Sequence, residues 1–440
     1  MFSHAREMYQ ADLLGIRLAP MVGPRIVCLQ TSACFPGFPE RLPASLGLGA
    51  REVHAVDVGV QGQMFTRPGD CMVLRWDAPY SDDSMNHALE INARLWRCQM
   101  GIEIAEPDCG RFEKVEAQGS LLDTAYDLYD HGAGALIASY LNPRTARRLL
   151  PNDSEFARIA ESHEFLNLKG HCVDLLARQG VSTPQSISFR LADRELPWLD
   201  RLDRHSSTRY VVKVDGACGG AGIFTNHDRG FKQQQLPRVI DRLAADGLNA
   251  SVQVQQFIPG TSLGAVALFE ADGSFRILSL HQQKTRSGKI AKLTWTFEMQ
   301  TQFAASASKA FEALADANEL RLLGPVGLDF QVAGNQLFAI EANARLCGSA
   351  PLYYVRELLG IGSSVQRISI INDVVVPPSL LEGDRLATVI GRARRIQPRA
   401  RILFQGINPF GCSKMLMIND DEQSTAERHM LAELKMLGNR

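Results

Sequence analysis

A glycine-rich stretch directly after a short apolar run constrains this chain more than any other feature. Residues 210–214 read Tyr-Val-Val-Lys-Val, a β-type run with Lys213 inside it. Each glycine costs roughly 0.5–1 kcal/mol of conformational entropy on folding, yet four follow within seven residues. Such a backbone offers a row of free N–H groups that suits phosphate, and a flexible surface loop is the alternative. The glycines are Gly216, Gly219, Gly220 and Gly222.

The lysine inside the apolar run points to the same kind of ligand. A charged side chain on a buried strand is costly unless its charge is paired. Phosphate oxygens would pair it, so we expect Lys213 to contact the α- or β-phosphate of a nucleotide.

A second signal lies downstream, where residues 326–332 and 337–342 read as two strands joined by a turn. Such a hairpin can bring Asp329 and Glu341 to one face, with Asn343 two residues further on the same face. Two carboxylates and an amide oxygen are hard oxygen ligands of the kind that magnesium takes beside nucleotide phosphates. An edge hairpin with solvated side chains is the alternative.

Arg345 continues this alternation. A guanidinium group at that position could neutralise a phosphoryl group during its transfer, so Arg345 is a candidate catalytic residue.

Taken together, these stretches resemble the ATP-grasp superfamily of carboxylate–amine ligases. Four features match in order over about residues 155–350, and their order and spacing are more specific than any one of them. They are Lys169 followed by Gly180-Val181-Ser182-Thr183-Pro184, Lys213 with its glycine loop, Gln255-Gln256-Phe257-Ile258-Pro259-Gly260, and Asp329 with Glu341-Ala342-Asn343-Ala344-Arg345.

The resemblance implies an α/β chain with an α+β ATP-grasp module. Residues 1–155 would form a parallel-sheet preATP-grasp domain, consistent with their alternating strand and helix patterns. Residues 156–350 would form the ATP-grasp domain, with a lid lobe at about 156–258 and a metal-binding catalytic lobe at about 259–350. Residues 351–440 would be a small C-terminal α/β extension, a layout similar to that of pheganomycin-type peptide ligases.

The resemblance also implies ATP and Mg²⁺ as cofactors, with Mn²⁺ as a substitute. Asp329, Glu341 and Asn343 would hold the metal, and Lys169, on a helix expected over 161–179, would reach the phosphates together with Lys213 and the glycine loop. The adenine would lie against the hinge Gln255, Gln256, Phe257 and Ile258, where relatives often have a Glu pair.

Here the amide oxygen of Gln255 can still accept a hydrogen bond from the adenine amine, whereas the acid that many relatives carry at about 261–263 is missing. A basic loop expected over 281–289 contains Lys284 and Arg286, which would face substrate or phosphate; a solvated loop is the alternative. His281, at a strand end, could act as a base, but a structural role is expected.

The implied activity is ATP-dependent formation of an amide bond between a carboxylate and an amine, plausibly an amino acid, through an acyl phosphate. The alternatives of the same fold are a kinase, which would need no amine, and a bicarbonate-activating carboxylase, which bicarbonate dependence would mark. A non-catalytic ATP-binding protein would be free to lose the Asp, Glu, Asn and Arg set that this chain retains.

Composition limits which other classes of protein the chain could belong to. The chain has 440 residues, of which 45% are hydrophobic and 22% charged, and its net charge of −1 gives no electrostatic footprint for nucleic acid. No apolar run is long enough for a membrane helix, and the first residues lack the apolar core of a signal peptide. Nine dispersed cysteines fit reduced thiols in a cytoplasm. We expect small-molecule carboxylate and amine partners; a homodimer is compatible with the resemblance.

Two further element predictions matter below. Residues 52–58 and 385–391 both read as strands.

Overall fold

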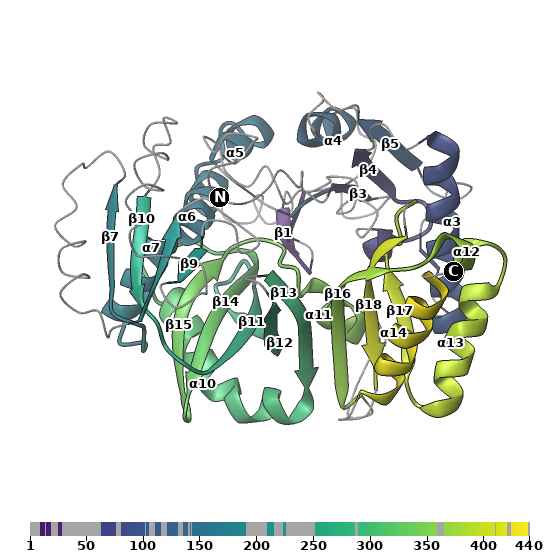
Figure 1. Cartoon of the computed structure of the whole chain (residues 1–440). Coiled ribbons are helices and arrows are strands. Elements are labelled where there is room, and N and C mark those ends of the chain that lie inside the picture. Colours follow the sequence, from purple (N-terminus) through teal and green to yellow (C-terminus); the bar gives the residue numbers. More distant parts are fainter. Residues whose placement is uncertain are drawn as a thin grey trace.

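The structure is a computed structural model of the chain (Figure 1). It describes residues 9–13, 15–18, 25–28, 63–75, 81–101, 103–104, 111–115, 121–130, 135–139, 141, 143–190, 209–214, 223–225, 251–286, 289–358, 365–409, 411–419 and 424–438.

The N-terminal part contains a six-stranded sheet with the order β1-β2-β6-β3-β4-β5. Its four strands β3, β4, β5 and β6 pair in parallel, which confirms the expected parallel α/β architecture. The hairpin β1–β2 adds an antiparallel edge. The elements are β1 (Tyr9–Asp12), β2 (Gly15–Leu18), β3 (Arg25–Cys28), β4 (Cys71–Arg75), α3 (Asp82–Met100), β5 (Arg111–Val115), α4 (Leu121–Asp130), β6 (Ala135–Ala138) and α5 (Pro143–Leu149), with the short 3-10 helix η2 (Gln63–Phe65) before β4.

A pair of helices and a small antiparallel sheet follow. The sheet has the order β7-β10-β8-β9 and carries the run with Lys213 on β8. The elements are α6 (Ser154–Asn167), α7 (Lys169–Arg178), β7 (Ser186–Arg190), β8 (Tyr210–Val214), β9 (Ile223–Thr225) and β10 (Ser251–Gln256).

The largest layer is an eight-stranded antiparallel sheet with the order β15-β14-β11-β12-β13-β16-β18-β17 (Figure 1). The strands predicted at 326–332 and 337–342 are confirmed as β14 and β15. The elements of the first five strands are β11 (Thr261–Phe269), β12 (Phe275–Arg286), β13 (Lys289–Thr296), α10 (Phe297–Ala315), β14 (Gly324–Ala333) and β15 (Gln336–Asn343), followed by α11 (Ala350–Leu358).

The two faces of this sheet differ in chemistry. Alternate residues such as Leu263, Leu328 and Phe330 pack with α7 and the apolar side of α10 into one core. The opposite residues of the same strands, Gly264 and Asp329, lie in cross-strand register on the other face. Because side chains alternate along a strand, the apolar core on one face fixes which side chains the other face presents.

The C-terminal segment continues the same sheet through β16, β18 and β17. This segment shares a core with Ile91 and Leu95 of α3 in the N-terminal part. Trp96 Nε1 of α3 also donates a hydrogen bond to the backbone oxygen of Phe404 on its strand β17, 3.1 Å away. The elements are β16 (Arg367–Val375), α12 (Pro378–Leu381), α13 (Arg385–Ile396), β17 (Arg401–Gln405), β18 (Cys412–Ile418) and α14 (Thr425–Gly438).

Three element predictions are wrong. Residues 385–391 form the start of helix α13, whose buried Leu386, Val389, Ile390 and Ala393 follow helical spacing. In the basic loop expected over 281–289, residues 281–286 are instead the end of strand β12, and Lys289 begins β13. The helix expected over 161–179 is two helices that meet at an extended residue, Leu168. The strand expected at 52–58 lies outside the described residues.

Candidate nucleotide and metal site

The hairpin β14–β15 brings the predicted carboxylates together. Asp329 and Glu341 are direct cross-strand partners, and Asn343 pairs with Gly327 two residues further along β14. A bulge between Asp329 and Phe330 interrupts the register just beyond this pair. The three oxygen-bearing side chains therefore belong to the face of the sheet that lies opposite the α10 core.

Two buried lysines from different elements converge on Glu341. Lys169, the first residue of α7, places Nζ 3.6 Å from Oε1, and Lys213, on β8, places Nζ 3.8 Å from Oε2. Lys213 Nζ also donates a hydrogen bond to the backbone oxygen of Ile340, 2.7 Å away. The side chains of Lys169 and Lys213 are only 3% and 4% exposed, so their charges must be paired inside the protein.

The position of Lys169 depends on the break between α6 and α7. The side chain of Asn167 accepts a hydrogen bond from the backbone N–H of Ala344 at 3.1 Å and donates one to the oxygen of the same residue at 3.4 Å. Leu168 then adopts extended torsion angles, and α7 begins at Lys169. Asn167 thereby fastens the start of α7 to the segment after β15, and periodicity alone did not reveal it.

Burial and neighbouring charges shift the pKa values of several side chains in this cluster. Burial, and then the charge of Glu341, raise the pKa of Asp329 to about 6. Burial alone would also raise the pKa of Glu341, but Lys169, Lys213 and Arg345 outweigh it and lower the pKa below its ordinary value. Burial lowers the pKa of Lys213 against the opposing effect of Glu341. Three groups of the cluster therefore have perturbed pKa values, as groups at functional sites often do.

The oxygen set suits a magnesium ion. Asp329, Glu341 and Asn343 contribute carboxylate and amide oxygens on one face. The raised pKa of Asp329 reflects its burial and the nearby charge of Glu341, and a bound cation would offset both. Within the described ranges, no three His, Cys, Asp or Glu side chains gather into a metal-binding group. The candidate set therefore depends on Asn343 as its third ligand.

Hydrogen bonds order the oxygens of this set. Arg345 donates from Nη2 to Asn343 Oδ1 at 2.8 Å, and Asn343 Nδ2 donates to Asp329 Oδ2 at 3.2 Å. Gln283 of β12 donates from Nε2 to Asp329 Oδ1 at 2.6 Å. Gln283 was missed because the sequence suggested a loop there; the alternation of β12 continued past His281 would have placed it on this face.

The predicted hinge residues follow one another at the end of β10. Gln255 is 2% exposed and lies on the same strand as Gln253, which faces Lys213. The backbone N–H groups of Gln256 and Phe257 donate to the backbone oxygens of Gln185 and Arg209. Those two N–H groups are thus already engaged in hydrogen bonds within the protein.

The other predicted site residues are not brought into this cluster. Lys284 and Arg286 are exposed at the end of β12, and alternation directs Lys284 to the face opposite Gln283. Their catalytic role stays a prediction, without support from this geometry. The four glycines of the loop after β8 lie outside the described residues.

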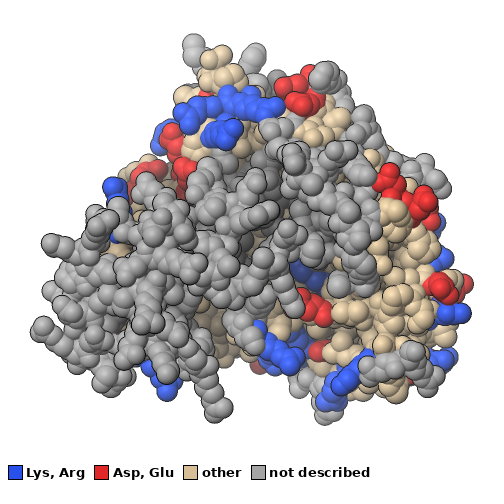
Figure 2. Space-filling model, turned by 45° about the horizontal axis from the view of Figure 1, so that its top comes forward, with Lys and Arg blue, Asp and Glu red and all other residues tan. Residues whose placement is uncertain are grey.

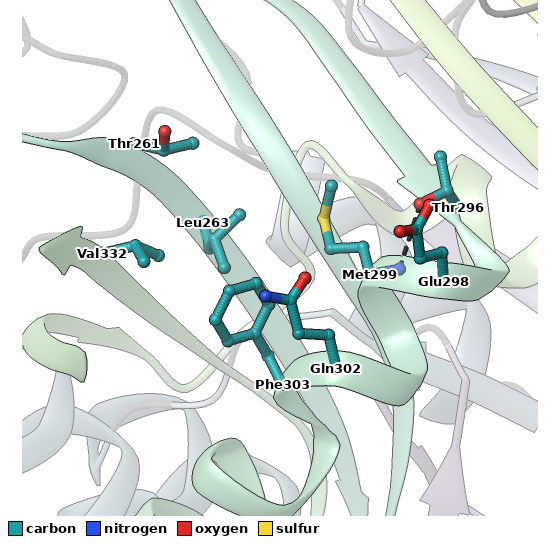
Figure 3. A pocket seen from close by; sticks show the side chains of 8 residues that line it. All are labelled: Thr261, Leu263, Thr296, Glu298, Met299, Gln302, Phe303 and Val332. Carbon is teal, nitrogen blue, oxygen red and sulfur yellow. Dashed lines mark hydrogen bonds between the residues drawn. The ribbon is translucent and has the colours of Figure 1, made fainter. Parts of the chain in front are cut away.

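A separate hollow of about 260 Å³ lies on the other side of the large sheet (Figure 3). Leu263 and Val332 belong to the core beneath α10, so this hollow does not adjoin the Asp329–Glu341 face. Figure 3 shows Met299, Gln302 and Phe303 projecting from the first turns of α10 toward the sheet. None of the hollow's lining residues belongs to the candidate site.

The surface and the helices of the described residues offer two more observations. Figure 2 shows acidic and basic side chains interspersed over the described part of one face, in keeping with the net charge of −1. No helix among the described residues is long and apolar enough to span a bilayer.

Comparison with known proteins identifies the domain. The model of the ATP-grasp domain family matches residues 167–349, which include both lysines and the acidic hairpin. The solved structure of a Campylobacter jejuni biotin carboxylase with a β,γ-ATP analogue is similar, with a TM-score of 0.53, 10% sequence identity, and coverage of 88% of this chain and 94% of that chain. An ADP complex of N5-carboxyaminoimidazole ribonucleotide synthetase is similar with a TM-score of 0.50, 9% identity, and coverage of 81% and 96%.

No curated protein sequence matches the chain. The sequence identity to both solved structures is too low to infer a shared function, so the similarity shows only that the fold is shared. From the family match, residues 167–349 of the chain form an ATP-grasp domain, and the similar structures share its fold.

Proposed function

We propose that this chain is an ATP-dependent ligase that joins a carboxylate to an amine through an acyl phosphate and releases ADP and phosphate. The observation that supports it most is the convergence of Lys169 and Lys213 on Glu341, directly opposite Asp329. Cationic groups beside paired metal-ligand carboxylates are what phosphoryl transfer from a metal-bound triphosphate requires. The match of residues 167–349 to the ATP-grasp domain family favours the same function.

Each cluster residue then has a role. Lys169, Lys213 and the amides of the glycine loop would hold the triphosphate. Asp329, Glu341 and Asn343 would hold Mg²⁺ or Mn²⁺, which would neutralise charge on the β- and γ-phosphates. Arg345, now donating to Asn343, would offset the charge that develops on the transferred group.

The reaction needs no protein nucleophile. An oxygen of the substrate carboxylate attacks the γ-phosphorus, the bond to the β-phosphate oxygen breaks, and ADP leaves. The amine nitrogen then attacks the acyl carbon, phosphate leaves, and the nitrogen gives up a proton. Positioning and charge compensation supply the rate, and exclusion of water protects the acyl phosphate from hydrolysis.

We further propose that residues 1–155 contribute to the substrate site as a preATP-grasp domain, with the nucleotide between a lid lobe at about 156–258 and a catalytic lobe at about 259–350. The substrates would be small molecules, with an amino acid as the amine. Two similar folds bear the names of a biotin carboxylase and a ribonucleotide synthetase, so dependence on bicarbonate belongs in the test.

Product analysis tests the proposal. The pure protein is incubated with ATP, Mg²⁺ and pools of amino acids, with and without candidate carboxylates or bicarbonate, and ADP is resolved from AMP. Amine-dependent ADP and phosphate support the ligase. ADP formed without any amine points to a kinase, or to a carboxylase if bicarbonate is needed, and AMP with pyrophosphate contradicts the acyl-phosphate route.

Matched variants connect the activity to the site. Lys169→Met and Lys213→Met should each raise the KM for ATP and lower turnover, because each removes a buried cation that would meet phosphate. Lys309→Met, the same change at an exposed position of α10, serves as the control and should behave like the wild type. Equal activity of all three variants would contradict the phosphate assignment.

A further inference from the structure

One hydrogen bond at the site crosses an entire strand. Gln283 on β12 donates to Asp329 on β14, although β11 lies between these two strands in the sheet. The register places Gly264 of β11 directly opposite Asp329 on one side and His281 on the other. The donor and acceptor thus meet above Gly264, where β11 has no side chain to separate them.

The absence of a side chain at Gly264 is a spatial requirement. A Cβ there would lie 2.5 Å from Nε2 of His281 and 2.6 Å from Nε2 of Gln283, closer than real Cβ contacts. A glycine in a strand interior weakens the strand and often marks a close approach of another group. The group that approaches here is the amide of Gln283.

His281 lies beside that amide, over the same gap at Gly264. Its side chain is 2% exposed, its Nδ1 lies 3.4 Å from the hydroxyl of Ser279, and burial lowers its pKa to about 3. The imidazole is therefore neutral at physiological pH and places no competing charge next to Asp329.

The amide has only one favourable orientation. A carboxylate accepts hydrogen bonds, so the NH₂ of Gln283 must point at Asp329 Oδ1, while Asn343 donates to Oδ2. The two amides hold the carboxylate from opposite ends and fix the plane in which its remaining lone pairs lie. Groups that orient a ligand in this way set metal affinity without touching the metal.

We propose that Gln283, reaching across the gap at Gly264, is the positioning residue that orients Asp329 for the metal of the nucleotide complex. This inference rests on the proposed function in so far as the site binds a metal nucleotide. It assigns a purpose to Gly264 and Gln283, and it requires that filling the gap and removing the amide have the same consequence.

The test measures Mn²⁺ binding by electron paramagnetic resonance at saturating ADP, which needs no turnover. Gln283→Met keeps the length of the side chain and removes the donor, and it should weaken Mn²⁺ binding about 10–100-fold, the usual effect of losing a group that orients a metal ligand. Gly264→Ala should weaken it to a similar extent. The double variant should be no weaker than the single ones, because both changes break one interaction.

Gln331→Met is the matched control. Gln331 is a half-buried glutamine on β14, two residues from Asp329, and its amide donates to Ser262 Oγ at 2.6 Å. This variant should bind Mn²⁺ like the wild type. Thermal melting and ADP binding without metal should stay unchanged in Gln283→Met, which separates orientation of the ligand from a general loss of structure.

The outcomes separate this inference from the ligase proposal. Wild-type Mn²⁺ affinity in Gln283→Met, or additive losses in the double variant, would overturn the inference and leave the ligase reading intact. If Gln283→Met weakens Mn²⁺ binding as expected but the wild-type protein forms no amide in the product analysis, the result supports this inference and not the ligase proposal. A wild-type protein that binds no Mn²⁺ with ADP would overturn both.

Discussion

Replacing Glu341 by Gln tests the electrostatic core of the site most directly. The change keeps the shape of the side chain but removes the negative charge that pairs with both Lys169 and Lys213. Two ammonium groups, 3% and 4% exposed, would then face each other with no carboxylate between them. The repulsion between these two ammonium groups and the cost of keeping them away from water, rather than the loss of one contact, determine how far the stability falls.

Removing one partner of a buried ion pair costs about 3–5 kcal/mol. Burial lowers the pKa of Lys213 and Glu341 raises it, so loss of Glu341 lowers that pKa further and makes the neutral lysine less costly, which favours the lower end of that range. Each kcal/mol shifts the melting temperature of a 150–250-residue unit by about 2–4 °C, so about 3 kcal/mol predicts a fall of roughly 6–12 °C. Turnover should be abolished, because a candidate metal ligand has gone.

The assay is thermal melting with and without ADP, together with ADP release from ATP. Phosphate groups would replace the missing negative charge, so ADP should stabilise Glu341→Gln more than it stabilises the wild type. Glu319→Gln is the control: it breaks an exposed pair with Arg178 and should change stability by at most about 1 kcal/mol. An unchanged melting temperature in Glu341→Gln, or near-normal ADP formation, would refute the reasoning.

Three further predictions concern the scaffold. Burial lowers the pKa of His163 to about 4, so its neutral form stabilises the fold above about pH 6.5 and this contribution is lost as the pH falls toward 4; in His163→Leu the acid-side slope of the unfolding free energy should flatten by up to about 1.4 kcal/mol per pH unit. Gly260→Ala would place a Cβ 1.8 Å from the backbone oxygen of Val332, and denaturant melts should show a loss of about 1–3 kcal/mol; wild-type stability would contradict this close approach. Asp70→Asn removes the charge from a buried pair with Arg25 at 2.6 Å and should lose about 3–5 kcal/mol, measured as a lower denaturation midpoint with an unchanged slope.

The pairing of the two carboxylates could be predicted from the sequence because it depends only on residues that lie close together in the chain. Alternation along two short strands and one turn suffices to pair Asp329 with Glu341. The convergence of Lys169 on Glu341 could be named only through the family resemblance, because the contact joins residues far apart in the chain and depends on the break at Leu168. No periodicity marks that break, since a single extended residue leaves the helical spacing on both sides intact.

The errors have a similar physical origin. Residues 385–391 contain enough β-branched and apolar residues to resemble a strand, but packing against α14 and α3 selects the helix. Residues 281–289 are rich in charge and resemble a loop, yet β12 pairs with β13 as far as Arg286. The same error concealed the role of Gln283. Its contact with Asp329 depends on Gly264 of the intervening strand having no side chain, so it can be recognised only when the arrangement of all three strands is known.

The joining of α3 to the C-terminal strands has a consequence for synthesis of the protein. Asn92 bonds to the backbone of Ile407, and Trp96 to that of Phe404, across separations of 315 and 308 residues. At about 5–20 residues per second, a ribosome needs roughly 15–60 s to complete that interval. During this time Ile91 and Leu95 of α3, which belong to the core of the C-terminal segment, lack that part of their native packing, so this part of the nascent chain is open to chaperones until its last strands emerge.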